Sequence, residues 1–199
     1  MTTDLRECEE AARAHGLAKG LDRALDGVDV RLAAPGPYAA VPAGRAGGAD
    51  VHRHRLAELE GVVFVRRDQD GPHDAEACAR VGRRLAHTRL GLARRLLDQA
   101  TVHLSARTGG GEPLSRKQMV IGTVADVMSG IELLRHYARS QDSRRALVDL
   151  HHRLDVLGWE IARLFGAAGY IADNEVRALH VSALAANTWI DGELSDDRV

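Results

Sequence analysis

The sequence predicts a mainly α-helical protein: a four-helix bundle with a short α/β extension at its amino terminus. Hydrophobic residues make up 45% of the 199 residues, but aromatic residues only 4%. Because strands prefer β-branched and aromatic side chains, a composition rich in Ala, Leu and Arg favours helices. Four segments after residue 74 also repeat apolar residues every three or four positions, which is the spacing of a helix that faces a core.

Charge, cysteine content and hydropathy exclude several classes of function. Basic and acidic residues number 27 and 28, so no net field attracts nucleic acid or an anionic membrane. Cys8 and Cys78 lie far apart and in no metal-binding spacing, which indicates free thiols. We find no apolar run that predicts a signal peptide or a membrane span. We therefore expect one main domain in a soluble, cytoplasmic protein.

The first predicted helix covers residues 3–26. Its apolar residues recur at close to helical spacing, and Gly27 is a residue that can end the helix. The apolar residues are Leu5, Ala12, Leu17, Leu21 and Leu25. Gly16 interrupts this pattern, so the segment predicts either one helix or two shorter helices that meet there.

The rest of residues 1–74 is predicted to alternate between strand and loop. The alternation from Val28 to Leu32 predicts a strand, and the Gly-, Pro- and Ala-rich stretch that follows predicts an irregular segment. A second strand is predicted at Val62–Val65, and Gly71-Pro72 indicates a loop between it and the bundle. Residues 1–74 are thus expected to form an abbreviated amino-terminal region.

The first two bundle helices have the strongest periodicity. Residues 75–107 carry apolar residues at helical spacing: Cys78, Val81, Leu85, Leu92, Leu96 and Ala100. Gly109-Gly110-Gly111 breaks this helix, and a flexible connector is a better interpretation of the three glycines than a phosphate-binding loop. Ser115 and Gln118 have capping-box spacing, which predicts a second helix from Ser115 to about Ser140.

Two further helices complete the predicted bundle. Leucines and isoleucines at helical spacing predict a third helix over residues 143–165, which Gly166 and Gly169 close. Asp173 is the predicted cap of a fourth helix, which continues to about Trp189. Four apolar-striped helices with connections of moderate length pack most simply as a bundle.

Several stretches of this bundle resemble the acyl-CoA dehydrogenase superfamily. Residues 91–100, GLARRLLDQA, are similar to that family's GLARRALDEA helix, and residues 106–118 follow its ER-x-x-FG-x-P-L/I-x-x-x-Q pattern without a gap. Residues 165–170, FGAAGY, are similar to the family's HGGxGY turn. The resemblance covers residues 75–192, which identifies them as the carboxy-terminal bundle domain and leaves residues 193–199 as a tail.

The resemblance implies a flavoprotein fold of three parts, in which FAD lies between a middle β-domain and this bundle. A neighbouring subunit's bundle supplies part of the FAD site, and a Glu removes the α-proton of an acyl thioester while the flavin takes a hydride from the β-carbon. Both groups must be held in one dry cavity. Five residues match the family's candidate cofactor-binding positions: Arg107, Gly111, Gln118, Gly166 and Gly169.

Other positions depart from the family pattern. Gly110 stands where the family has a phenylalanine, Arg163 where it has a glutamine, and Val181 and Ser182 where it has arginine and aspartate. The segment before the bundle is also too short for a helical domain plus a β-domain. We therefore regard the chain as a truncated, degenerate relative.

The catalytic Glu is missing from both places that the family uses. Its usual location aligns with Ile190, and its alternative location aligns with Val81. Only a one-residue shift would bring a carboxylate, Asp191, to the usual location, which makes it a weak candidate base. Because an apolar side chain cannot accept a proton, we do not expect this chain to carry out ordinary desaturation alone.

Two other groups of residues have a functional and a structural interpretation. His52 and His54 could present imidazoles on one face of a strand, but no partner set of Asp, Glu or Cys accompanies them, so we expect solvated histidines and no metal. Arg107 could contact a pyrophosphate or simply satisfy the carboxy-terminal end of its helix, and the two interpretations have about equal weight.

Three functional hypotheses follow. The leading hypothesis is an acyl-CoA dehydrogenase-like accessory subunit that forms a homodimer, or a hetero-oligomer with a full-length acyl-CoA dehydrogenase, and takes part in binding FAD and an acyl thioester within that complex. The second is a flavin-independent enzyme or small-molecule-binding scaffold of specialised metabolism. The third is a bundle retained only for dimerisation.

Overall fold

A computed structural model describes residues 2–67, 73–140, 143–170 and 174–190. The prediction of a mainly α-helical protein is confirmed. The predicted cap Asp173, the candidate base Asp191 and the predicted tail lie outside the described residues. None of the described helices combines the length and apolar character needed to cross a membrane.

The amino-terminal part contains short helices and three strands. In chain order they are α1 (Thr2–His15), α2 (Leu17–Ala24), α3 (Val30–Ala33), β1 (Tyr38–Pro42), β2 (Val51–His52), α4 (Arg55–Leu59) and β3 (Val62–Arg66). The remainder consists of α5 (Ala75–Ala106), the hairpin β4 (Thr108–Gly109) and β5 (Glu112–Pro113), α6 (Gln118–Ser140), α7 (Arg144–Leu164), the 3-10 helix η3 (Gly166–Tyr170) and α8 (Arg177–Trp189).

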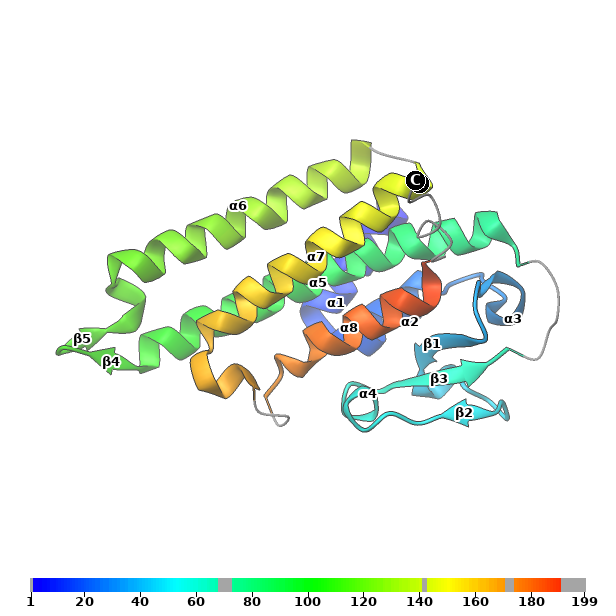
Figure 1. The fold of residues 1–199 in the computed structure, drawn as a ribbon, viewed down its shortest axis with the longest axis horizontal. Coiled ribbons are helices and arrows are strands. Elements are labelled where there is room, and N and C mark those ends of the chain that lie inside the picture. Colours follow the sequence, from blue (N-terminus) through cyan, green and yellow to red (C-terminus); the bar gives the residue numbers. More distant parts are fainter. Residues whose placement is uncertain (1, 68–72, 141–142, 171–173, 191–199) are drawn as a thin grey trace, which may run out of the picture.

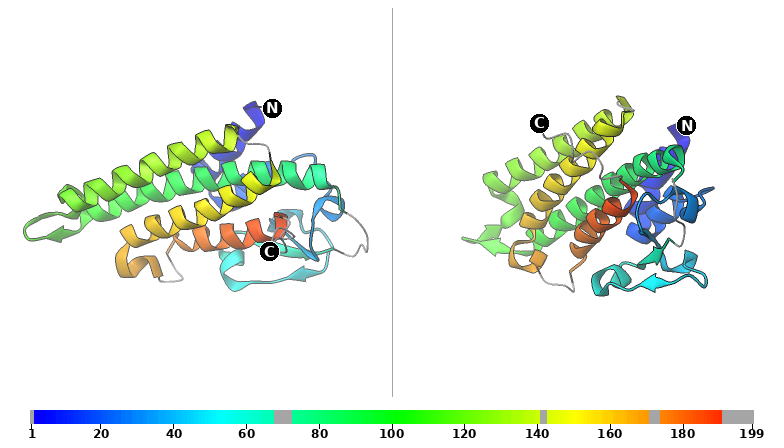
Figure 2. Two further views of the ribbon diagram at one scale, coloured as in Figure 1. Left: turned by 45° about the horizontal axis from the view of Figure 1, so that its top comes forward. Right: turned by 45° about the vertical axis from the view of Figure 1, so that its right-hand side comes forward.

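Helix α5 is the central element of the molecule. It packs against α1 and α2 on one side and against α6, α7 and α8 on the others (Figure 1). The hairpin β4–β5 projects from one end of the bundle, and the small three-stranded sheet lies toward the other end, beside α8 and α2 (Figure 2). The four predicted bundle segments therefore all form helices, and α1 and α2 are added to them.

The two possible forms of the first segment are resolved in favour of two helices. Gly16 separates α1 from α2 with a φ of 84°, a conformation that a residue with a Cβ rarely adopts. The predicted strand from Val28 to Leu32 is wrong, because Val30–Ala33 form the short helix α3. Asp29 caps α3, its carboxylate accepting a hydrogen bond from the Arg31 amide at 2.9 Å. The helix cap therefore decides the secondary structure of this segment, although its apolar residues alternate as in a strand.

The sheet has the strand order β1-β3-β2, with both pairs antiparallel. The predicted strand at Val62–Val65 is confirmed as β3, but β1 lies within the Gly-, Pro- and Ala-rich stretch that is predicted to be irregular, and β2 begins at the end of that stretch. Two hydrogen bonds attach the sheet to α8: the Ala40 amide donates to Thr188 Oγ1, and Trp189 Nε1 donates to the Ala40 carbonyl, both at 2.9 Å. Strand β1 was missed because alanines carry little strand propensity.

The limits of the bundle helices follow from their caps. Asp74 caps α5 and Ser143 caps α7, each side chain accepting from an amide in the first turn. The capping box predicted at Ser115 is wrong: Leu114–Arg116 form a 3-10 turn, the Ser115 hydroxyl accepts from Ser105, and α6 begins only at Gln118. Helix α8 begins at Arg177, later than predicted.

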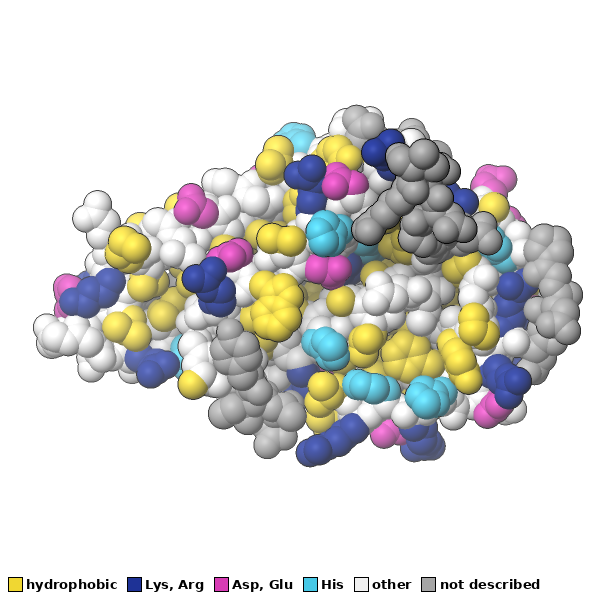
Figure 3. Space-filling view, viewed as in Figure 1, with side chains coloured by type: hydrophobic (Ala, Val, Ile, Leu, Met, Phe, Trp, Pro, Cys, Tyr) yellow, Lys and Arg dark blue, Asp and Glu magenta, His cyan; other side chains and the backbone are white. Residues whose placement is uncertain are grey.

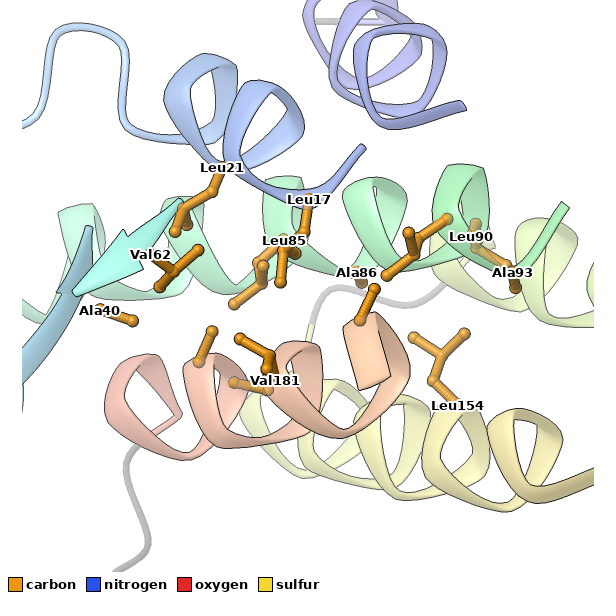
Figure 4. Packing of buried hydrophobic residues seen from close by; sticks show 14 of the residues in the cluster. Leu17, Leu21, Ala40, Val62, Leu85, Ala86, Leu90, Ala93, Leu154 and Val181 are labelled. Atoms are coloured by element: carbon orange, nitrogen blue, oxygen red, sulfur yellow. The ribbon is translucent and has the colours of Figure 1, made fainter. Parts of the chain in front are cut away.

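One apolar core joins both parts of the chain. Leu17 and Leu21 of α2, Leu85 of α5 and Val181 of α8 meet in it (Figure 4). Trp189 is fully buried in the same core. The helices come unusually close at one point: a Cβ on Gly91 of α5 would lie 2.0 Å from the Glu9 carbonyl oxygen of α1.

An ion cluster also ties α1 to α5 and α6. The Glu9 carboxylate accepts a hydrogen bond from Arg135 Nε at 3.0 Å, and it lies 3.4 Å from His87 Nδ1. Burial alone would raise the pKa of Glu9, but the hydrogen bonds from His87 and Arg135 outweigh it and lower the pKa to about 2. Glu9 is therefore charged at neutral pH and holds the three helices together.

Candidate functional site

Two of the five candidate cofactor-binding residues lie together at the hairpin end of the bundle. Arg107 follows the last turn of α5, and Gly166 follows α7 as the first residue of η3. A Cβ on Gly166 would lie 3.8 Å from Arg107 Nη1, so the guanidinium covers this glycine. Arg107 Nη1 also lies 3.5 Å from His103 Nε2, and the His103 ring is 5.5 Å from the Phe165 ring. The result is an exposed cation beside an aromatic side chain and a glycine turn.

The other three candidates are arranged differently. Gly110 and Gly111 both have positive φ in the turn of the β4–β5 hairpin, so the predicted flexible connector forms a tight hairpin. Gly111 and Gln118 are exposed, and no hydrogen bond among the described residues joins either of them to Arg107 or Gly166. Gly169 packs tightly against α7, because a Cβ there would lie 2.6 Å from the Ala162 carbonyl oxygen.

The positions aligned with the family's catalytic Glu carry no carboxylate in the described structure. Val81 is fully buried in the core face of α5. Ile190 is half-buried directly after α8. Neither side chain can transfer a proton, so the described part of the chain offers no base at these two positions.

Helix α6 exposes large apolar side chains along its length. Met119 is 84% exposed and Leu133 66%, and Ile121 and Met128 are exposed as well. We call these four residues the exposed apolar residues of α6. They lie on both flanks of the stripe that faces α5, so α6 is apolar around most of its circumference. Helices of this kind are usually buried in an assembly.

A groove of about 450 Å³ lies between α7, α8, α4 and α5. Its walls are mostly apolar and include Leu154 and Ala162 of α7 and Leu179 of α8. Trp159 stands at its edge and is 61% exposed. Figure 3 shows this face of the molecule, with apolar side chains over the middle of the bundle and histidine side chains toward the small sheet. We call this cavity the α7–α8 groove.

A buried cation lines the α7–α8 groove. Arg89 of α5 is only 4% exposed, and its Nη2 donates to the Asp155 carboxylate of α7. Its Nη1 donates to the His151 carbonyl at 3.1 Å and lies at the same distance from His151 Nδ1. His151 Nε2 in turn donates to the Gly82 carbonyl at 3.0 Å. Burial and the neighbouring Arg89 charge lower the pKa of His151 to about 3, so this imidazole is neutral.

A second cation, Arg177, also lines the groove and is paired with Glu60. Arg177 Nε lies 2.8 Å from a carboxylate oxygen of Glu60, and both side chains are largely buried. Burial raises the pKa of Glu60 above its ordinary value, although the Arg177 charge opposes this. Nearby, the His54 and His180 rings are 6.5 Å apart. Within residues 2–67, 73–140, 143–170 and 174–190, no three His, Cys, Asp or Glu side chains are placed to hold a metal ion.

Sequence reasoning did not identify the groove, although one signal was available. Arg89 follows Leu85 by four positions and precedes Leu92 by three, so it occupies a core position in the apolar stripe of α5. A charge at such a position needs a buried partner. The partner Asp155 and the exposed Trp159 lie on a different helix and carry no signal of their own.

Comparison with known proteins supports the fold. No protein-family model matches the chain, and no curated protein matches it. Among solved structures, butyryl-CoA dehydrogenase from Megasphaera elsdenii is 13% identical, with a TM-score of 0.52 over 80% of this chain and 49% of that one. A protein described as an FAD-dependent dehydrogenase is 20% identical, with a TM-score of 0.52 over 71% and 46%.

A third similar structure is a glutaryl-coenzyme A dehydrogenase in complex with glutaryl-CoA. It is 18% identical, with a TM-score of 0.51 over 72% of this chain and 45% of that one. The chain thus spans about half the length of the solved structures that it matches. At these identities the likeness shows the fold, which is that of the acyl-CoA dehydrogenase helical bundle.

Proposed function

We propose that this chain is an acyl-CoA dehydrogenase-like subunit that pairs with a second bundle and contributes to a flavin site at the contact. The partner is a second copy of the chain or a full-length acyl-CoA dehydrogenase. The single observation that carries the proposal is the hairpin end of the bundle, where the Arg107 guanidinium lies over Gly166. Residues 75–192 are the unit that we propose to act in this way, with residues 1–74 as an abbreviated region that packs on it.

The residues at this end suit one portion of FAD. The Arg107 guanidinium is exposed, has donors for a pyrophosphate and lies over the glycine turn at Gly166. Gly166, Gly169, Gly111 and Gln118 are the further proposed contacts from the same resemblance. When bound, FAD would supply the acceptor for a hydride taken from an acyl thioester.

The chain's own residues would bind and orient the cofactor in this proposal. Arg107 would neutralise phosphate charge, and the turn at Gly166 would leave room for a close approach of the ligand. Proton removal is proposed for the partner, or for Asp191 as the remaining carboxylate near the family's usual base. This is an accessory role, in which the active site is completed across two subunits.

Pairing is proposed because the exposed apolar residues of α6 need a cover. Between Gln118 and Glu132 the helix carries only one charged residue, Asp126, so two copies can approach without strong repulsion. A contact of this kind between identical surfaces forms a symmetric dimer. The same surface would also accept another bundle of the same fold.

The test of this proposal is flavin capture and oligomeric state. The purified chain is mixed with FAD, alone and together with a full-length acyl-CoA dehydrogenase, then desalted and examined by absorbance between about 350 and 500 nm and by light scattering. Flavin retained in a complex that Arg107→Ala weakens at least tenfold supports the proposal. A monomer that retains no flavin under either condition overturns it. Arg116→Ala, an exposed cation on the same end, is the matched control.

A second candidate function is supported by the α7–α8 groove. Its volume of about 450 Å³ falls in the range of about 300 to 1,000 Å³ that is usual for small-molecule sites. Apolar walls with a few polar groups are typical of such sites. The groove therefore favours flavin-independent binding of a small molecule, as enzyme or as scaffold.

A further inference from the structure

The chemistry of the α7–α8 groove restricts which ligand it can hold. Its two cations are each paired with a carboxylate, Arg89 with Asp155 and Arg177 with Glu60. The ionised side chains of the groove therefore balance one another. A charged ligand would lose its hydration without gaining a free counter-charge, which is costly in an apolar cavity. The groove consequently favours an uncharged ligand.

Asp155 provides the polar contact point. Its side chain lines the groove and is 39% exposed, whereas its partner Arg89 is almost fully buried. A carboxylate can accept about four hydrogen bonds, and Arg89 is the one donor to Asp155 among the described residues. The carboxylate therefore retains acceptor capacity on the groove side. Only a ligand with a hydroxyl or N–H group can use it.

Trp159 and Gly158 determine the shape of the site. The indole of Trp159 is large and flat, and its exposure at the groove edge leaves a face open for stacking. Gly158, one residue earlier on α7, has no side chain in the groove. A Cβ there would lie 3.7 Å from Leu179, in ordinary contact, so the absence of a side chain keeps the groove wide and is not required by helix packing. A flat ring fits between these two features.

From these observations we infer that the α7–α8 groove binds an uncharged aromatic or fused-ring compound whose hydroxyl or N–H group donates a hydrogen bond to Asp155. The ring stacks against Trp159 and lies between Leu154 and Leu179. This inference rests on the second candidate function, small-molecule binding in the groove. It requires neither flavin nor a partner subunit.

The test uses two probes that differ only in the donor group. 2-Naphthol carries a hydroxyl, and 2-methoxynaphthalene has the same ring system without a donor. Binding of each to the full chain is measured by fluorescence titration and by chemical shifts of the Trp indole protons. We expect saturable binding of both, with 2-naphthol about tenfold tighter, because a hydrogen bond to a charged group is stronger than one to a neutral group.

Two variants locate the binding. Gly158→Leu fills the groove and should weaken both probes at least tenfold, with circular dichroism used to confirm that the helices are intact. Val156→Leu adds a methylene on an exposed position of the same helix and should leave both affinities unchanged.

The results test the hydrogen bond to Asp155 separately from small-molecule binding in the groove. Equal affinities that Gly158→Leu abolishes would overturn the hydrogen-bond donor as the recognised group and leave small-molecule binding in place. Binding that is insensitive to Gly158→Leu, or no saturable binding at millimolar probe, overturns both. A preference for 2-naphthol that disappears in Gly158→Leu and persists in Val156→Leu supports both.

Discussion

The two ends of the bundle differ in how the same helices are covered. Toward the sheet, α5 is surrounded by α1, α2, α7 and α8, and its side chains are buried on nearly every face. Toward the hairpin, α5 and α6 extend together, and of the 23 residues of α6 only Val127, Ile131 and Leu134 are buried. Apolar side chains are nevertheless as frequent on α6 as elsewhere. The buried apolar residues of α5 stabilise the fold of a single chain, whereas the exposed apolar residues of α6 are available to a partner.

Burial, and not hydrophobicity, therefore separates the residues that stabilise the fold from those that can form an interface. An apolar residue on α5 near Leu85 contributes on the order of 2 kcal/mol through its burial. Met119 is as apolar but remains in water, so it contributes little to the isolated chain. Substitutions of one kind should therefore have opposite consequences at the two ends.

The largest contrast is expected for glycine-to-alanine substitutions. Gly91→Ala would place a Cβ 2.0 Å from the Glu9 backbone and push α1 away from α5, lowering the free energy of unfolding by about 2 to 3 kcal/mol. Gly122→Ala meets nothing within 4 Å on α6 and should raise it by up to about 1 kcal/mol, because alanine is the better helix former. Urea denaturation followed by circular dichroism measures both. Equal effects of the same sign would remove the distinction between the ends.

Titration of His151 is expected to change the free energy of unfolding by about 2 kcal/mol. His151 has a pKa of about 3 in the folded chain and about 6.5 when unfolded, so below pH 6.5 the unfolded state binds the extra proton. The stability that depends on neutral His151 is therefore complete above pH 6.5 and decreases as the pH falls toward 3, by about 2 kcal/mol between pH 7.5 and 5.

The test of this pH effect is the slope of unfolding free energy against pH in the wild type and in His151→Gln. Glutamine can still donate to the Gly82 carbonyl but does not titrate. The slope between pH 6.5 and 5 should flatten in the variant. Glu9 does not interfere there, because its stabilising charge is lost only as the pH falls below about 4.5 toward 2. An unchanged slope would mean that His151 is solvated.

A smaller gain in stability is expected for a substitution at Gly158 in the α7–α8 groove. Gly158→Ala should stabilise α7 by about 0.5 to 1 kcal/mol, because the added Cβ makes ordinary contacts with Leu179 and alanine favours the helix. Thermal unfolding would show this as a rise in midpoint. A lower midpoint would show that the groove wall is already closely packed at this point. The α7–α8 groove would then have no space for a ligand beside Leu179.

The sequence predicts the long elements well because their signal is local. Helices α5 and α7 were located to within a few residues, since periodicity and the break or cap at each end lie within the segment itself. Strand β1 and helix α3 were not predicted. Their structure depends on contacts distant in sequence, such as the hydrogen bond from Trp189 to Ala40, which short alanine- and valine-containing stretches do not reveal.

The contacts within the candidate sites also join residues that are distant in sequence, and the sequence alone does not reveal them. Arg107 and Gly166 are far apart in sequence, and only the antiparallel return of α7 brings them together, so the resemblance named both but could not show their proximity. Arg89 was visible as a charge in an apolar stripe, but its partner Asp155 depends on the rotation of α7 about its axis. Pairwise geometry between helices is set by packing of whole faces, which a single sequence does not encode locally.

The smallest effect on stability is expected at Leu133, which is exposed although it is next to the buried Leu134 on the same helix. Leu133→Ser replaces a side chain that is 66% exposed on α6, so the free energy of unfolding of the monomer should change by less than about 0.5 kcal/mol. Leu134→Ser, one residue later, replaces a buried side chain and should cost several times more, because the lost burial of a leucine is on the order of 2 to 5 kcal/mol. Analytical ultracentrifugation separates the two roles: Leu133→Ser should weaken self-association at least tenfold while leaving the unfolding curve of the dilute protein in place. If Leu133→Ser destabilises the dilute protein as much as Leu134→Ser does, the exposed apolar residues of α6 belong to the fold of the single chain, and a partner is no longer needed to explain them.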